Sequence, residues 1–224
     1  MNPFSDGSSG SMRGAPVLVY AGLLLSQLSI VPSVSLGQGS VEAATSDNES
    51  QTATFAGGCF WCMEPPFDKM DGVLSTTSGY TGGRTKNPRY EQVKTGRTGH
   101  IESMQVKFDP TKVSYEQLLW LFWHNVDPTR SDGQFCDKGN QYRPMIFYHN
   151  AEQRALAEQT KQKAREQLGV RLPTGIVKAT KFYPAEDYHQ DYYKTHPTKY
   201  KFYRWKCGRD ARLTAVWGEK AGKP

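Results

Sequence analysis

Short apolar runs and amphipathic segments alternate along the chain from about residue 52 onward. Polar and apolar side chains alternate over residues 102–109, which is the period-two pattern of a strand with one partly wet face. Four more strands are predicted at 52–56, 72–79, 145–148 and 176–183. A one-sided pattern fits a sheet covered by helices on one face better than a sheet buried on both. We therefore expect a single α+β domain, a two-layer sandwich with a mixed or antiparallel sheet.

Helices are predicted between these strands from capping residues. The run Ser114–Gln117 is a capping box and should open a helix that continues to about Val126. Asn150 should cap a helix that ends at Leu168, with Gly169 as its stop. A short helix is expected over 185–194, and an aromatic and basic tail follows it.

Two regions are harder to assign. A helix should begin near Cys59, but Pro65 and Pro66 are disfavoured inside a helix, so it should be short, bent or late in starting. The glycine-rich run 80–88 reads as a loop. The polar stretch 127–143 is long for a connection in a compact domain, so it is either functional or disordered.

The first 43 residues have the features of a secretory signal peptide. Arg13 precedes a stretch, 14–41, without charge, and its apolar core over 17–31 is shorter than the roughly 20 residues of a membrane span. Val41 and Ala43 supply small residues before a cleavage point. We expect a signal peptide over 1–43, a polar linker over 44–51 and the domain over 52–224. The protein would then be periplasmic or secreted, without stable membrane association after cleavage; an uncleaved anchor and an organelle transit peptide are the alternatives.

Composition narrows the possible functions. The chain has 224 residues, is 37% hydrophobic and 12% aromatic, and so has a globular composition. Its net charge of +6 is spread out, and no run of like charges suggests a nucleic-acid partner. Four cysteines are too few for a disulfide-built mini-protein, so their positions carry the information.

The first chemical signal is Cys59, which follows Gly57 and Gly58 at the expected start of a helix. Amide groups and the helix dipole at such a position favour a thiolate and should lower the pKa of the thiol. Cys62 lies three residues on, at a spacing that permits a disulfide. We therefore interpret Cys59 as a nucleophile and Cys62 as its partner.

Other uses of these cysteines need to be weighed. Structural zinc usually takes two paired motifs, but Cys136 and Cys207 stand alone, and haem attachment would need a histidine where Met63 lies. We expect no metal, no nucleotide site and no flavin or nicotinamide. Buried cysteine as a small apolar residue remains possible, and a thioredoxin-like oxidoreductase is the serious rival. We interpret the histidines as structural: His100, His124, His149, His189 and His196.

Glu102 is a candidate acid. It shares strand parity with Met104, Val106 and Phe108, so its side chain should point toward the apolar face. Burial there would raise its pKa and keep a proton available near neutral pH. The alternative is that Glu102 marks the wet end of the strand.

The motifs at 58–61, 79–83, 87–90, 99–102 and 137–143 occur in a consistent order. Together they resemble those of the type A peptide-methionine sulfoxide reductases, over about residues 55–193. The resemblance implies a two-layer α+β fold, reduction of the S epimer of methionine sulfoxide, no cofactor, and thioredoxin as the usual external reductant. We also expect a monomer.

The resemblance also implies roles for individual residues. Cys59 would attack the sulfoxide sulfur, with Phe60 and Trp61 holding the substrate methyl group. Glu102 would protonate the departing oxygen. Tyr90 and Tyr142 would donate hydrogen bonds to that oxygen, and Asp137 would support the substrate.

Attack would leave Cys59 as a sulfenic acid, which a second thiol condenses into a disulfide. Cys62 is our preferred resolving thiol because it is adjacent. Cys207 in the tail is the second candidate, and Cys136 beside Asp137 is the third.

Overall fold

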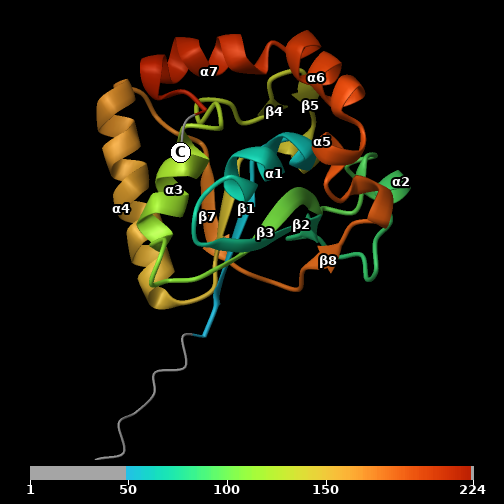
Figure 1. Ribbon diagram of the computed structural model, residues 1–224, viewed down its shortest axis with the longest axis horizontal. Helices are drawn as coiled ribbons and strands as arrows, with labels where there is room; N and C mark the ends of the chain where they lie inside the picture. The colour runs from blue at the N-terminus through green and yellow to red at the C-terminus, as the bar shows by residue number, and fades with distance from the viewer. Residues whose placement is uncertain (1–48, 223–224) are drawn as a thin grey trace, which may run out of the picture. The chain divides into compact units, whose positions relative to one another are not determined.

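A six-stranded sheet runs through the structure in the order β7-β6-β1-β3-β2-β8 (Figure 1). The structure is a computed structural model that describes residues 49–222, so the predicted signal peptide and most of the predicted linker lie outside it. The strands are β1 Gln51–Ala56, β2 Val73–Thr81, β3 Ile101–Phe108, β6 Met145–Tyr148, β7 Gly175–Lys178 and β8 Tyr183–Pro184. Neighbouring strands are antiparallel except β6 and β7. The sheet is therefore mixed, as the sequence predicted.

Helices pack on this sheet, and two of them confirm the predicted caps. The helices are α1 Phe60–Asp68, α2 Tyr90–Val93, α3 Tyr115–Trp123, α4 Ala151–Leu168, α5 Tyr192–Thr195, α6 Pro197–Lys206 and α7 Arg209–Trp217. Ser114 caps α3 through a capping box, although this helix ends three residues earlier than expected. Asn150 caps α4, and Gly169 ends it in the left-handed conformation, at φ 66°.

The main core lies between the sheet and helices α1 and α3. The ring of Phe55 on β1 lies 5.5 Å from that of Phe67 on α1 and 5.3 Å from that of Phe122 on α3. Full burial of such a side chain contributes about 1.5–3 kcal/mol. Met104 and Val106 on β3 are buried in the same cluster. The period-two pattern of β3 therefore assigned the core face correctly.

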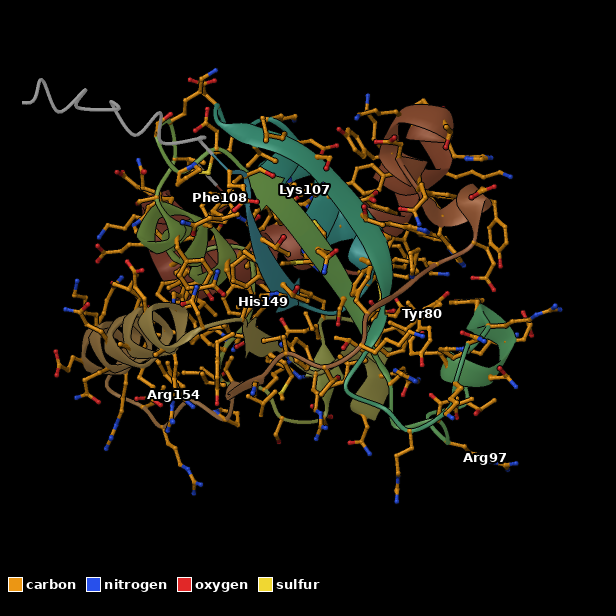
Figure 2. The ribbon with its side chains drawn as sticks, turned by 90° about the horizontal axis from the view of Figure 1, so that it is seen from below. Tyr80, Arg97, Lys107, Phe108, His149 and Arg154 are labelled. Carbon is orange, nitrogen blue, oxygen red and sulfur yellow. A yellow bond between two sulfur atoms is a disulfide. The ribbon has the colours of Figure 1, made fainter. Side chains whose placement is uncertain are left out.

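The hairpin of β2 and β3 connects this core to a site at its other end. The two strands are antiparallel, with Tyr80 paired to Glu102 at one end and Val73 paired to Phe108 at the other. In Figure 2, Lys107 and Phe108 lie at one end of β3 and Tyr80 lies at the opposite end of the hairpin. Thr81 is the last residue of β2, so this strand takes in the start of the predicted loop 80–88.

The predicted strand 176–183 is wrong. Its first part is β7, which pairs with β6 at one edge of the sheet, and its last residue begins β8, which pairs with β2 at the other edge. The connecting residues run past the end of β2, where the Lys181 carbonyl accepts a hydrogen bond from the Thr81 hydroxyl. Local alternation identifies extended chain, but it cannot show that the two halves pair with strands on opposite edges.

The predicted helix 185–194 is also wrong. The segment contains a 3-10 turn, Asp187–His189, followed by Asp191 in the left-handed conformation, at φ 51°, and only then the short helix α5. Pro65 and Pro66 do not end α1, which is short, at nine residues, and begins directly after Cys59. The tail, for which no elements were predicted, forms α6 and α7.

The long polar segment 127–143 is ordered. It forms a small hairpin of β4 Gly133–Gln134 and β5 Asp137–Lys138, followed by a 3-10 turn, Asn140–Tyr142. The buried side chain of Gln134 fixes the base of this hairpin, because Oε1 of Gln134 accepts a hydrogen bond from the Asp127 amide at 2.8 Å. Of the two explanations given for the length of this segment, disorder is therefore wrong and function remains.

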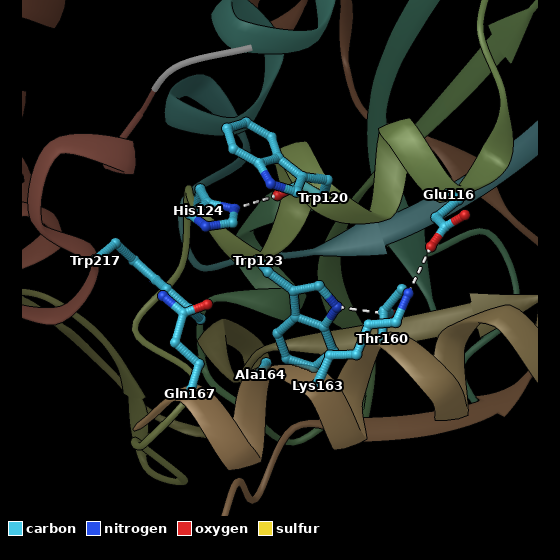
Figure 3. Close-up of a pocket in the computed structure, with 9 residues that line it drawn as sticks. All are labelled: Glu116, Trp120, Trp123, His124, Thr160, Lys163, Ala164, Gln167 and Trp217. Carbon is cyan, nitrogen blue, oxygen red and sulfur yellow. Dashed lines mark hydrogen bonds and ion pairs between the residues drawn. The ribbon is translucent and has the colours of Figure 1, made fainter. Parts of the chain in front are cut away.

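Helix α7 closes the structure over α3 and α4. A shallow pocket remains where the three helices meet, and Figure 3 shows Trp120, Trp123 and Trp217 around it. Trp123 is buried, and its indole N–H donates to the Thr160 hydroxyl at 3.0 Å. Within residues 49–222, no helix has the length and apolarity that crossing a membrane requires.

Candidate active site

The turn from β1 into α1 places Cys59 at the start of the helix. Gly58 has φ 85°, and a Cβ atom there would lie 2.6 Å from the Cβ of Gln134. Only glycine fits this conformation and this close approach. Cys59 follows as the N-cap of α1, as the sequence predicted.

A small cavity of ≈ 80 Å³ lies beside Cys59. It is lined by Cys59, Phe60, Trp61, Tyr90, Glu102, Asp137, Tyr142 and Tyr203. The first seven are the residues that the sequence analysis selected for catalysis and for the substrate pocket. They come from α1, α2, β3 and the 127–143 segment, and the fold brings all of them together. Tyr203, from α6, was not predicted.

The aromatic wall of this cavity is fixed by side chains from residues 186–203. The ring of Trp61 stacks on that of Tyr192 at 3.7 Å, and its indole N–H donates to Nδ1 of His189 at 3.1 Å. Phe60 is buried, with its ring 5.0 Å from that of His189. His189 is therefore structural, as expected, although it lies directly behind the site. No spacing motif in the sequence points to Tyr192 or His189 as supports of this wall.

Glu102 lies at the edge of the cavity and is 2% exposed. Burial raises the pKa of Glu102 to about 8, while a hydrogen bond from the Phe60 amide, at 3.3 Å, opposes the rise. A carboxyl with this pKa keeps its proton at neutral pH. The interpretation of Glu102 as the wet end of a strand is therefore wrong, and the expected burial is confirmed.

The two tyrosines supply hydroxyl donors to the same cavity. Burial raises the pKa of Tyr90 to about 12 and also raises the pKa of Tyr142, so both keep their protons across the physiological range. Glu186 positions Tyr90 by accepting from its backbone amide at 2.9 Å. The same carboxylate accepts from the Tyr80 hydroxyl at 2.9 Å.

Asp137, on the ordered segment 127–143, forms one side of the cavity. Burial raises the pKa of Asp137, and a hydrogen bond from the Tyr203 hydroxyl, 2.5 Å from Oδ2, opposes the rise. The cavity therefore holds a thiol, two carboxyls of raised pKa and two tyrosine hydroxyls. Such a set can deliver protons to an oxygen atom while a sulfur atom is attacked.

The predicted low pKa of Cys59 is wrong for the resting site. Burial raises the pKa of this thiol, and neighbouring Cys62 and Glu102 raise it further. The amide that should have stabilised the thiolate, that of Phe60, donates to Glu102 instead. The Cys62 amide donates to the backbone carbonyl of Cys59 at 3.0 Å. Two of the first N–H groups of α1 therefore donate to oxygen atoms and not to the Cys59 sulfur.

Cys62 is buried next to Cys59. A hydrogen bond from the Cys59 thiol lowers the pKa of Cys62 to about 7, against the effect of burial, and the positive charges of Arg209 and Arg204 lower it further. The pair therefore shares one negative charge, with the proton on Cys59. This contact fits the choice of Cys62 as the resolving thiol.

Cys136 and Cys207 form a disulfide, with their Cα atoms 4.8 Å apart. Neither candidate is therefore a free thiol beside Cys59 in this structure. Cys136, Asp137 and Cys207 are also the one group of possible metal ligands within the described part of the chain. Metals bind thiolates, so sulfurs joined in a disulfide do not supply a zinc site.

Comparison with known proteins decides the family. A family model described as peptide methionine sulfoxide reductase matches residues 51–221. The chain belongs to the peptide methionine sulfoxide reductase family. The reductase MsrA of Bacillus licheniformis is 54% identical over 172 residues, which are 76% of this chain and 95% of that protein. MsrA of Bacillus subtilis is 49% identical over 77% of this chain and 98% of its own length.

Solved structures of reductases have the same fold. Mxr1 of Saccharomyces cerevisiae in reduced form has a TM-score of 0.65 at 30% identity, covering 68% of this chain and 88% of that one. Methionine sulfoxide reductase A of Corynebacterium diphtheriae has a TM-score of 0.60 at 33% identity, covering 66% and 76%. The chain is thus an oxidoreductase with redox-active cysteine, and the thioredoxin-like alternative does not hold.

Proposed function

We propose that this reductase converts the S epimer of methionine sulfoxide, free or in proteins, to methionine. The observation that carries the proposal is the cavity itself, in which Cys59, the protonated Glu102 and two tyrosine hydroxyls surround one small space. Phe60 and Trp61 form its apolar wall, and aromatic rings attract the sulfur of a methyl thioether. The site is therefore suited to a CH3–S–O group.

In the first step, the Cys59 thiol passes its proton to the Cys62 thiolate, and the Cys59 sulfur attacks the sulfoxide sulfur while Glu102 gives its proton to the oxygen. Hydrogen bonds from Tyr90 and Tyr142 stabilise the charge that develops on this oxygen. The substrate S–O bond breaks, the thioether leaves, and the oxygen ends on Cys59 as a sulfenic acid. The substrate sulfur gains two electrons, and the Cys59 sulfur loses two.

In the second step, Cys62 resolves the sulfenic acid. Its sulfur forms a bond to the Cys59 sulfur, the S–OH bond breaks, and one water leaves. The positive charges of Arg209 and Arg204 lower the pKa of Cys62 and so favour the thiolate, which is the form that attacks. Cys207 is tied to Cys136, so Cys62 is the better candidate.

A dithiol of the thioredoxin class then reduces the Cys59–Cys62 disulfide by thiol–disulfide exchange. Every proton and electron of the cycle is supplied by side chains of this chain and by that reductant. We therefore propose that the enzyme works without a prosthetic group.

We further propose that the protein is exported before it acts. The features of residues 1–43 motivate this proposal. The Cys136–Cys207 disulfide supports it, because structural disulfides persist mainly in oxidising compartments. Mass measurement of the protein from cell-envelope and cytosolic fractions should find a chain that begins near residue 44 in the envelope. An uncut chain in the cytosol would refute export.

The reaction can be tested with the two resolved epimers of a methionine sulfoxide peptide and dithiothreitol as reductant. We expect the S epimer to be consumed and the R epimer to remain. A parallel assay with insulin should show no reduction of its disulfides above the rate of dithiothreitol alone. Consumption of neither epimer would overturn the proposed function.

A further inference from the structure

The cavity beside Cys59 has one wall that neither the motifs nor the proposed chemistry includes. Tyr203 on α6 lines this cavity together with Cys59 and Glu102. Its ring stands nearly perpendicular to that of Trp61, at 81°, with the centroids 5.9 Å apart. A methyl group held between Phe60 and Trp61 would therefore also face Tyr203.

The hydroxyl of Tyr203 is committed to Asp137. It donates to Oδ2 of Asp137 at 2.5 Å, and burial raises the pKa of Tyr203, so the hydroxyl keeps its proton. Asp137 has no ion pair among the described residues. Tyr203 is thus the donor that holds this carboxyl against the cavity wall.

Two links one helical turn apart join α6 to the loop that carries Asp137. The first is the Tyr203–Asp137 hydrogen bond, and the second is the Cys207–Cys136 disulfide. Residues four apart lie on the same side of a helix, and Cys136 and Asp137 are adjacent in the chain. Figure 1 shows α6 beside β5, which begins at Asp137.

Few other contacts fix α6 in this place. No residue of α6, which the structure describes in full, is completely buried, and beyond Tyr203 the helix has one ring contact with its surroundings, that of Tyr200 with Tyr193 at 6.1 Å. Arg204 on α6 forms its ion pair with Asp210, which also belongs to the tail. The next helix has its own anchor, because the buried Arg209 donates to the Asn125 carbonyl at 2.7 Å. Loss of the disulfide should therefore loosen α6 and leave α7 in place.

We propose that Tyr203 is a positioning residue of the sulfoxide site and that the Cys136–Cys207 disulfide clamps it there. The ring of Tyr203 closes the methyl pocket, and its hydroxyl fixes Asp137. Under this proposal Cys207 takes no part in the thiol–disulfide exchange that regenerates Cys59. The inference rests on the proposed function, because the pocket it completes is the one for the substrate methyl sulfoxide.

The test uses the full chain in single turnover without external reductant, so that the clamp stays closed during the measurement. Thiol counting first confirms that Cys59 and Cys62 are reduced and that the other two cysteines are bonded. The rate of methionine formation is then measured against substrate concentration. This separates the half-saturating concentration from the maximal rate. Thermal unfolding of every variant reports on the fold.

Tyr203→Phe should raise the half-saturating concentration about tenfold, because a hydrogen bond to a carboxyl is lost, and should change the maximal rate little. Tyr148→Phe, on β6 and outside the cavity, is the matched control and should behave as wild type. Cys136→Ser and Cys207→Ser should each raise the half-saturating concentration, and both should continue to turn over with a thioredoxin-class reductant.

Each failure has a distinct meaning. A wild-type protein that leaves the sulfoxide unchanged would overturn the proposed function and this inference with it. An active wild type with an unaltered half-saturating concentration in Tyr203→Phe would overturn the inference alone. Loss of multiple turnover in Cys207→Ser, with single turnover intact, would place Cys207 in the relay and refute the clamp.

Discussion

Glu102 shows at the scale of one residue how burial sets chemistry. Its pKa is raised from 4.5 to about 8, so the acid form is present below that pH and is lost as the pH rises through it. If Glu102 is the proton donor, kcat/KM should fall as the pH passes about 8. Glu102→Gln should lower the rate about a hundredfold below this pH and remove the inflection.

The control for this prediction is Glu116→Gln. Glu116 is an exposed carboxyl, paired with Lys163 on the surface at 3.0 Å, and its loss should leave the pH profile unchanged. A Glu102→Gln variant with the wild-type profile would remove Glu102 from catalysis.

The residue scale also shows what the sequence could and could not reveal about the site. The parity of Glu102 with Met104 and Val106 predicted its burial, because strand alternation is a local property. The pKa of Cys59 was predicted with the wrong sign. Its helix amide donates to a carboxyl 42 positions further along the chain, and no local pattern reports such a contact.

At the scale of elements, α1 contains a second buried carboxyl. Glu64 is 1% exposed, and burial raises its pKa from 4.5 to about 7, although the Ser78 hydroxyl donates to it at 2.9 Å. A raised pKa in the folded state means that stability is fully present at low pH and is lost as the pH rises.

Ionisation of Glu64 should therefore lower the free energy of unfolding by about 2 kcal/mol as the pH rises from about 5 to about 7. Glu102 acts in the same direction, so the wild-type decline combines both. In Glu64→Gln, the part of this decline that Glu64 causes should be absent, as measured by urea unfolding at several pH values. Curves that remain parallel to wild type would contradict the account of Glu64.

Elements were predictable where their signals are local. The capping residues Ser114 and Asn150 marked two helices correctly, since a cap acts within its own turn. The helix predicted over 185–194 was wrong because Asp191 takes a left-handed conformation beside the Trp61 wall. The surrounding structure determines this conformation. Helix α6 was not predicted because its exposed aromatic residues give no apolar stripe. Helix α7 does have one, Leu213 and Trp217 four residues apart, and the sequence analysis missed it.

At the scale of the whole molecule, the tail returns to the start of the domain. Arg209 is buried, and its guanidinium donates to the Gly57 carbonyl, 152 positions away, at 3.3 Å. It also lies 4.3 Å from the ring of Phe135. The turn before Cys59 is thus supported by a residue near the other end of the chain.

Helix α7 should accordingly contribute to the stability of the whole domain. Trp217 is 4% exposed, and its indole N–H donates to the Val126 carbonyl at 2.9 Å. Trp217→Ala should lower the free energy of unfolding by about 3–5 kcal/mol. Trp205→Ala removes the same side chain where it is 74% exposed, and should change stability by less than about 0.5 kcal/mol. Equal effects in urea unfolding would show that α7 is not part of the cooperative core.

The central claim is that the Cys59 sulfur accepts the oxygen of the sulfoxide. It is tested most directly by mass spectrometry of the Cys62→Ser variant after one turnover, in the presence of a nucleophile that traps sulfenic acids. We predict one methionine formed per enzyme and a trapped adduct on Cys59 alone, whereas wild type should give a Cys59–Cys62 disulfide. Methionine formation with no adduct on Cys59, or with the adduct on another residue, would contradict the account.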